Sequence, residues 1–308
     1  MRLESISLLD RYQGCLVGLA CGDAVGTTVE FSPRGSFTPV TDMVGGGVFD
    51  LRAGEWTDDT SMALCLAQSF LSQRAHDPAD QLRRYLNWWH HGYMSSNGVC
   101  FDIGSTVATA LHFHEQHGNL VAVTSDPKMA GNGSIMRLAP AVLWAFPGLQ
   151  EVLRIAVGTS LTTHAAAEAV DACRVLAVVL VNALQGAAPA DLLEGAAGVA
   201  EEPKLKALAN RDIAALDVAS IRGSGYAVDS LEAALWCVMT TGSYRDAALA
   251  AANLGDDADT TAAIAGQIAG AVHGINAIPP SWRETLAEGG MITTLATRLH
   301  DERVVQQG

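Results

Sequence analysis

Apolar residues recur at three- and four-residue intervals along most of the 308-residue chain. This spacing places them on one face of an α-helix. Strand signals are weak, and the best candidate, residues 41–49, contains three consecutive glycines and is expected to be a loop. The pattern therefore predicts an all-α protein. The expected helices span 8–22, 60–72, 79–91, 105–117, 134–145, 150–159, 165–184, 189–199, 229–240, 244–253, 259–273 and 285–300.

The chain shows no internal repeat and no low-complexity linker. Its polar stretch 201–210 is short enough to be a loop inside one domain. Hydrophobic residues make up 49% of the sequence and charged residues 17%, which excludes a disordered chain and supplies a large core. We expect residues 1–308 to form a single compact helical domain that acts as a monomer.

Small residues recur along the expected helix 259–273. Ala262, Gly266 and Gly270 are spaced four apart, with Ala265 and Ala269 beside them. Side chains at this spacing lie on one helical face, so a neighbouring backbone can approach closely. This pattern predicts a buried helix in tight contact with a partner helix.

The charge and the apolar runs exclude several classes of partner. The formal net charge is −14 and no run is rich in Lys or Arg, so we expect neither a nucleic acid nor an anionic membrane surface as partner. The longest conspicuous apolar stretch, 175–181, is far shorter than the roughly 20 residues that span a bilayer. Asp10, Arg11 and Asp23 interrupt any signal-peptide core. Six scattered cysteines without a CxxC pair indicate a reducing cytoplasm.

Two segments combine carboxylates and hydroxyls at the start of an expected helix. One is Thr57-Asp58-Asp59-Thr60 and the other is Asp256-Asp257-Ala258-Asp259-Thr260-Thr261. Each alone could simply cap its helix, because Asp and Thr favour these positions. Five acids drawn together would repel one another unless a cation lay among them. Carboxylate and hydroxyl oxygens suit Mg²⁺, Mn²⁺ or Ca²⁺, so two facing helix starts could hold a two-metal centre.

A third segment, Gly131-Asn132-Gly133-Ser134-Ile135-Met136-Arg137, combines glycines, an expected helix start and an arginine. Glycines let a ligand approach the backbone, and helix N-termini and arginine both bind phosphate. The segment could therefore hold a diphosphate, although an ordinary glycine-rich turn has the same appearance.

In their order along the chain, these motifs resemble the ADP-ribosylglycohydrolase family, in particular the bacterial dinitrogenase reductase-activating glycohydrolase type. The resemblance spans nearly the whole chain. It is carried by the segments 18–26, 29–31, 56–60, 101–104, 131–137, 162–164, 223–226 and 253–261.

The resemblance implies an all-helical fold with two divalent cations, Mg²⁺ or Mn²⁺, in a cleft. The family's metal ligands correspond to Thr57, Asp58, Asp59, Asp257, Asp259 and Thr260, with Asp259 bridging the two ions. Relatives often have Gly-Gly-Asp where this chain has Gly255-Asp256-Asp257, so Asp256 adds a further acid.

The resemblance also implies the remaining site residues. Asp102, Asp59 and Glu30 are the expected catalytic residues, although a loop or capping role for Asp102 and an exposed loop position for Glu30 remain alternatives. His164 and Tyr226 correspond to positions near the bound nucleotide, or they only pack in the core. The expected substrate-binding residues are Gly131, Asn132, Gly133, Ser134, Met136, Arg137, His164 and Tyr226.

The implied reaction is metal-dependent hydrolysis of the bond between ADP-ribose and a protein side chain, most consistently arginine, with ADP-ribose as product. ADP-ribosyl-serine and O-acetyl-ADP-ribose are alternative substrates. A non-catalytic ADP-ribose-binding relative is a further alternative, although all six ligand positions are present. Two other classes also remain: a terpenoid cyclase, and a His-Asp phosphohydrolase using His76-Asp77 or His300-Asp301.

Overall fold

The computed structural model describes residues 6–307, and the regular secondary structure of this part of the chain is helical. It contains no strand, only two isolated bridges, Gly46 with Leu51 and Gly131 with Tyr226. The helices are α1 Leu8–Gly26, α2 Asp58–Gln73, α3 Pro78–His91, α4 Ser105–His117, α5 Ala139–Ala145, α6 Leu149–Leu161, α7 Ala167–Gln185, α8 Ala196–Val199, α9 Pro203–Ala209, α10 Ala227–Thr240, α11 Tyr244–Ala252, α12 Ala258–His273, α13 Pro280–Thr285 and α14 Gly289–Gln307.

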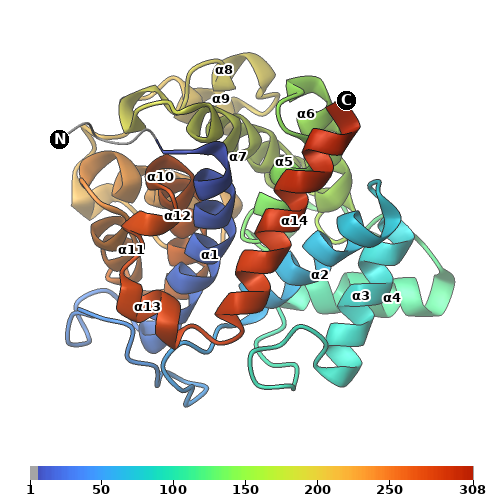
Figure 1. Ribbon diagram of the computed structural model, residues 1–308, viewed down its shortest axis with the longest axis horizontal. Helices are drawn as coiled ribbons and strands as arrows, with labels where there is room; N and C mark the ends of the chain where they lie inside the picture. Colours follow the sequence, from blue (N-terminus) through green and yellow to red (C-terminus); the bar gives the residue numbers. More distant parts are fainter. Residues whose placement is uncertain (1–5, 308) are drawn as a thin grey trace.

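Helices α1 and α12 form the centre of the fold and lie side by side (Figure 1). Glycines face each other across this contact, and a Cβ on Gly18 would lie 2.5 Å from the carbonyl oxygen of Gly266. Gly14 and Gly270 meet in the same way one turn further along. The small-residue pattern of α12 thus does what the sequence predicts, since it allows two backbones to touch.

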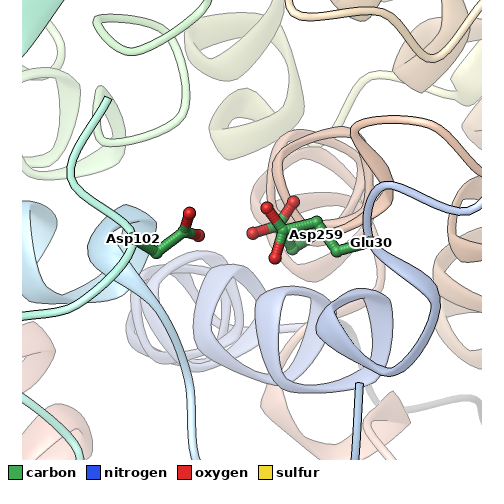
Figure 2. Close-up of side chains that lie close together, drawn as sticks. All are labelled: Glu30, Asp102 and Asp259. Carbon is green, nitrogen blue, oxygen red and sulfur yellow. The ribbon is translucent and has the colours of Figure 1, made fainter. Parts of the chain in front are cut away.

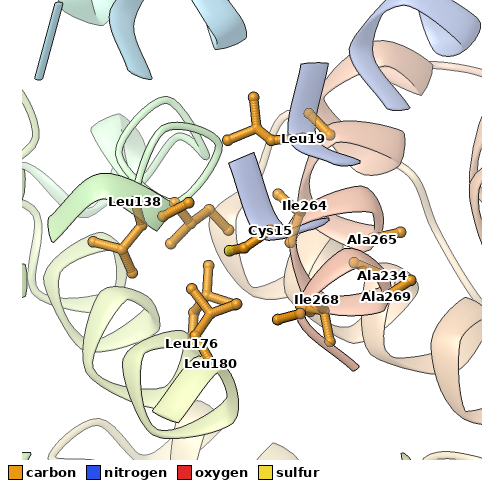
Figure 3. Close-up of a cluster of buried hydrophobic side chains, with 14 of the residues drawn as sticks. Cys15, Leu19, Leu138, Leu176, Leu180, Ala234, Ile264, Ala265, Ile268 and Ala269 are labelled. Atoms are coloured by element: carbon orange, nitrogen blue, oxygen red, sulfur yellow. The ribbon is translucent and has the colours of Figure 1, made fainter. Parts of the chain in front are cut away.

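Other helices surround this pair. One continuous hydrophobic cluster joins α1 and α12 to α7 and to the segment before α5, with Leu19, Leu138, Leu176 and Ile264 at its centre (Figure 3). All six cysteines are free, and all but Cys100 are buried. Within residues 6–307, none of the helices combines the length and the apolar character that crossing a membrane requires.

A second, smaller cluster joins α2, α3 and α4. Met62, Tyr85 and Leu111 are among its buried members, and Ile103 packs against it from the loop before α4. This cluster holds the loop 92–104 against the body of the protein, and Asp102 lies in that loop.

The expected helices are found, with four corrections. The helix expected at 285–300 begins only at Gly289, and a separate short helix, α13, precedes it where none was predicted. The helix expected at 134–145 begins only at Ala139, because Pro140 lacks an N–H group and favours the first helical turn. Residues 189–199 form a 3-10 turn and the four-residue α8 rather than one helix. The expected loop 201–210 contains α9, which starts at Pro203, again a proline at a helix start.

Candidate functional site

The two acid-rich segments meet where α2 and α12 begin. Oγ1 of Thr57 lies 3.2 Å from Oδ2 of Asp259. Oγ1 of Thr260 donates a hydrogen bond to Oδ2 of Asp59 at 3.3 Å. Both carboxylates are almost completely buried. Segments about two hundred positions apart in the sequence therefore share one cluster of oxygen atoms.

Helix capping does not explain the two segments. Thr57 and Asp257 occupy the N-cap positions of α2 and α12, and neither side chain makes a capping hydrogen bond. The carboxylates of Asp59 and Asp259 lie in the first turns of these helices and meet at the shared cluster. Capping by their own side chains therefore does not account for these residues.

Asp23, near the end of α1, caps α2 instead, and sequence analysis gave it no role. Its carboxylate accepts hydrogen bonds from the N–H groups of Thr57 and Thr60, at 2.9 and 3.1 Å. It also accepts from both hydroxyls, at 3.0 Å from Thr57 and 2.6 Å from Thr60. The available signal was a lone acid within residues 14–26 of α1, which are otherwise small or apolar. Asp23 positions the start of α2 relative to α1.

Glu30 and Asp102 complete the cluster. One oxygen atom from each of Glu30, Asp102 and Asp259 lies within 4.8 Å of the others. In Figure 2, Asp102 points from its loop toward the other two side chains. Glu30 is only 3% exposed, so the alternative of an exposed loop acid is wrong.

Strained backbone holds these two loops. Asp102 has a φ of 57° and Phe31, directly after Glu30, has a φ of 59°. Non-glycine residues rarely adopt such angles, and those that do often lie at functional sites. The N–H of Phe31 donates to the carbonyl of Asp256 at 2.7 Å, and the N–H of Asp256 donates to that of Ser32 at 2.8 Å. These bonds tie the Glu30 loop to the start of α12.

Burial and mutual repulsion raise the pKa values of the clustered acids. Burial is the larger cause and repulsion by neighbouring carboxylates the smaller one. Together they raise the pKa values of Asp59 and Asp259 well above the usual range. The same causes, in the same order, raise the pKa of Asp102 to about 7 and that of Glu30 to about 9. Desolvation raises the pKa of Asp23 to about 6, although its hydrogen bonds oppose the shift. The cluster therefore favours the binding of a positively charged ligand.

The oxygen atoms present fit a divalent cation. Oδ1 of Asp59, Oδ1 of Asp259 and Oε2 of Glu30 are buried and have no hydrogen-bond partner among the residues that the structure describes. Buried carboxylate oxygens without partners are costly, and hard cations such as Mg²⁺ and Mn²⁺ bind such atoms. The donor set thus matches the metal chemistry expected from the sequence.

The cluster forms one wall of a cavity of about 670 Å³. Among the expected metal ligands, Asp58, Asp257, Asp259 and Thr260 line it, whereas Thr57 and Asp59 lie buried behind them. Phe31 also lines the cavity, with 62% of its surface exposed, and sequence analysis did not assign it a role. The other lining residues include Gly131, Asn132, Gly133, Met136, His164, Ser224 and Gly225.

The Gly131 loop forms the opposite wall. Asn132 anchors it, since its Nδ2 donates to Oδ2 of Asp257 at 2.6 Å and to Oγ of Ser230 at 2.8 Å. Its N–H donates to the carbonyl of Gly225 at 3.1 Å. The loop ends in a turn, because the helix that was expected to start at Ser134 starts at Ala139. At this loop a diphosphate would meet backbone N–H groups rather than a helix terminus, whereas the N-terminus of α4 lines another part of the same cavity.

Three residues expected to bind substrate do not line the cavity. Arg137 is buried, and its guanidinium donates to the hydroxyl of Thr163 at 2.5 Å. Ser134 is buried beside Cys173. The phenol of Tyr226 donates to Glu168 and accepts from Lys204 at 2.8 Å. These three side chains therefore lie behind or beside the residues that line the cavity.

The two His-Asp pairs lie outside the acidic cluster, and each makes local contacts elsewhere in the fold. Asp77 caps α3 by accepting from the N–H groups of Ala79 and Asp80. His76 lies against Gly158 and Gln81, and the ring of His300 lies beside Asp301 and the ring of Tyr12. Neither pair belongs to a group of metal-binding side chains among residues 6–307, so the phosphohydrolase alternative is wrong.

Comparisons with known proteins identify the family of this chain. A family model described as ADP-ribosylglycohydrolase matches residues 4–308. The chain is 47% identical over 293 residues to "ADP-ribosylarginine hydrolase Tri1" of Pseudomonas putida, covering 95% of this chain and 78% of the relative. It is 30% identical over 284 residues to the "ADP-ribosyl-[dinitrogen reductase] glycohydrolase" of Rhodospirillum rubrum, covering 91% of each chain.

A solved structure has the same fold. The chain matches a protein of an "ADP-ribosylglycohydrolase-related protein complex" with a TM-score of 0.85 and 39% identity, over 96% of this chain and 98% of the other. The family model, these relatives and the paired acidic helix starts lead to one conclusion. The chain belongs to the ADP-ribosylglycohydrolase family.

Proposed function

We propose that the protein hydrolyses the N-glycosidic bond between ADP-ribose and an arginine side chain of a protein, and so reverses mono-ADP-ribosylation. The observation that carries this proposal is the convergence of Asp59 and Asp259 in one acidic cluster, whose member Asp259 lines the same cavity as the Gly131 loop. Relatives that are 47% and 43% identical to the chain are named as ADP-ribosylarginine hydrolases.

Six residues would hold two divalent cations, Mg²⁺ or Mn²⁺. When bound, the cations would supply positive charge that activates water and holds the ribose hydroxyls. The residues are Thr57, Asp58, Asp59, Asp257, Asp259 and Thr260. The buried oxygens of Asp59 and Asp259 without partners support this assignment, and Asp23 fixes Thr57 and Thr60 in place.

The opposite wall orients the ADP-ribose. Gly131 and Gly133 leave space for the diphosphate to approach the backbone, and Asn132 holds this loop to Asp257. His164 lines the cavity behind the two glycines. When the ribose is held at the metal site and the diphosphate at the Gly131 loop, attack of water on the anomeric carbon is effectively intramolecular. This arrangement lowers the activation free energy by several kcal/mol in general.

Asp102 moves the proton. In the metal-free chain, burial raises the pKa of this carboxyl to about 7, which favours its protonated form relative to that of an exposed aspartate. It can give a proton to the leaving guanidine nitrogen as the glycosidic bond breaks, and take one from the attacking water afterwards. Glu30 faces Asp102 and Asp259 and shares this role as the second catalytic acid.

The whole of residues 1–308 acts as one domain and as a monomer in this proposal. The two walls of the cavity are joined through the larger hydrophobic cluster, which includes α1, α7 and α12. The partner is an ADP-ribosylated protein, and ADP-ribose is the product.

A panel of defined ADP-ribosylated peptides tests the reaction. We expect release of ADP-ribose from an arginine-linked peptide with Mg²⁺ or Mn²⁺, and none after EDTA treatment. A serine-linked peptide and O-acetyl-ADP-ribose are the comparison substrates. Faster release from either of these would replace arginine as the acceptor, and release that is unaffected by EDTA would exclude the metal site.

A further inference from the structure

Arg137 is a buried cation whose contacts are with neutral groups. It is 1% exposed. Its Nη2 donates to Oγ1 of Thr163 at 2.5 Å, and its Nη1 to the sulfur of Met62 at 3.5 Å. Its guanidinium carbon lies 4.8 Å from the centre of the Tyr85 ring. Burying a charged group among neutral side chains costs free energy, so the burial of Arg137 is expected to serve a function.

The hydroxyl of Thr163 connects Arg137 to His164. Oγ1 of Thr163 lies 2.8 Å from Nδ1 of His164. A guanidinium can only donate, so Thr163 uses a lone pair to accept from Arg137. Its hydroxyl hydrogen is then available for Nδ1. The opposite arrangement, in which Nδ1 donates, would leave that buried hydrogen without a partner, at a cost of about 1–3 kcal/mol.

The other ring nitrogen of His164 faces the substrate side. A Cβ on Gly133 would lie 3.0 Å from Nε2, and a Cβ on Gly131 would lie 3.5 Å from it. Both glycines and His164 line the cavity. Among residues 6–307, Nε2 has no hydrogen-bond partner, whereas the backbone of His164 is fixed by bonds to Ser160.

Burial and a nearby positive charge also keep the imidazole ring of His164 neutral. Burial, and then the positive charge of Arg137, lower the pKa of His164 to about 3. An imidazole that stays neutral at physiological pH carries one proton, and its tautomer is set by the bond that the other nitrogen makes.

We propose that Arg137, acting through the hydroxyl of Thr163, holds His164 in the tautomer with its proton on Nε2 and so gives the cavity an uncharged N–H donor for oxygen atoms of ADP-ribose. Arg137 and Thr163 are positioning residues in this arrangement. The inference deepens the proposed function and rests on it for the identity of the ligand.

Nitrogen NMR of the full chain tests the tautomer directly. In protein labelled with ¹⁵N on histidine, we expect the wild type to show a protonated Nε2 and an unprotonated Nδ1 for His164. His164→Gln identifies the signal. Thr163→Ser keeps the hydroxyl and should keep this tautomer, whereas Thr163→Val should shift the population toward a proton on Nδ1. A wild-type proton on Nδ1 overturns the inference without any variant.

Binding of ADP-ribose in Mg²⁺ buffer gives the functional readout. Calorimetry should show that Thr163→Val weakens ADP-ribose binding about threefold to tenfold, the loss of one hydrogen bond, while Thr163→Ser stays within about twofold. Thr294→Val, on the exposed face of α14, is the matched control and should bind as the wild type does. Circular dichroism checks that each variant is folded.

The outcomes separate this inference from the proposed function. Equal binding by folded Thr163→Val and Thr163→Ser proteins contradicts the inference alone. A wild type that binds ADP-ribose but releases none from arginine-linked peptide contradicts the proposed function and leaves the inference standing. Absence of ADP-ribose binding by the wild type contradicts both.

Discussion

The hydroxyl oxygen of Thr57 lies 3.2 Å from Oδ2 of Asp259, although 202 positions separate the two residues in the sequence. This contact brings the first turn of α2 against the first turn of α12, at the end of the glycine-lined contact between α1 and α12. The centre of the fold therefore sets the geometry of the acidic site.

Removing a carboxylate of the cluster should remove metal binding and turnover together. Asp59→Asn and Asp259→Asn keep the side-chain shape, and each should lower hydrolysis by more than about 100-fold. For the wild type, metal at 100 times its Kd should add about 2.7 kcal/mol to the free energy of unfolding. Thermal unfolding with and without Mg²⁺ measures this gain, which the two variants should lack.

Asp50→Asn is the matched control for these variants. Asp50 is exposed, is not among the residues that line the cavity and has a φ of 51°, an angle that asparagine tolerates well. It should retain stabilisation by Mg²⁺. Stabilisation of Asp59→Asn as large as that of the wild type would show that the cluster is not the metal site.

The free energy of unfolding of the metal-free protein should fall as the pH rises. The pKa of Asp102 is about 7 in the folded chain against 3.8 ordinarily, and that of Glu30 is about 9 against 4.5. A carboxyl with a raised folded pKa binds its proton more tightly when folded, so its stabilisation is present at low pH and is lost as the pH rises through the folded pKa.

Urea unfolding of EDTA-treated protein between pH 5 and pH 9 measures this dependence. Because cations favour the charged carboxylates, the same series with Mg²⁺ should show a weaker dependence or a reversed one. A metal-free protein whose free energy of unfolding rises across this range would contradict the arrangement of the acids.

Widening the contact between α1 and α12 should damage fold and site together. A Cβ on Gly18 would lie 2.5 Å from the Gly266 carbonyl oxygen, so Gly18→Ala must push the backbones apart. We expect a loss of about 3 kcal/mol in the free energy of unfolding and weaker metal binding. Gly198→Ala has open space around its Cβ and should be neutral or stabilising by up to about 1 kcal/mol. Equal urea midpoints for the two variants would refute close packing here.

Sequence analysis succeeded where the signal is local. The spacing of Ala262, Gly266 and Gly270 predicts a tight helix contact, and the acids before residues 60 and 260 predict an oxygen-rich site. It failed where a role depends on distant partners. Asp23 acts through Thr57, 34 positions away, and the guanidinium of Arg137 turns to Thr163 rather than to the cavity. Nothing in the neighbouring sequence reveals which way such a side chain points.

Asp102→Asn should slow the chemical step while leaving binding intact. Asparagine tolerates the φ of 57° at this position but cannot deliver a proton. We expect kcat on arginine-linked peptide to fall about 100-fold and the Kd for ADP-ribose to change little. ADP-ribose joined to a better leaving group, which needs no proton, should recover most of the lost rate, because only leaving-group protonation is missing. Asp126→Asn, on an exposed loop, controls for the substitution. An equal loss of rate for both leaving groups would show that Asp102 acts elsewhere in the reaction than at the departing nitrogen.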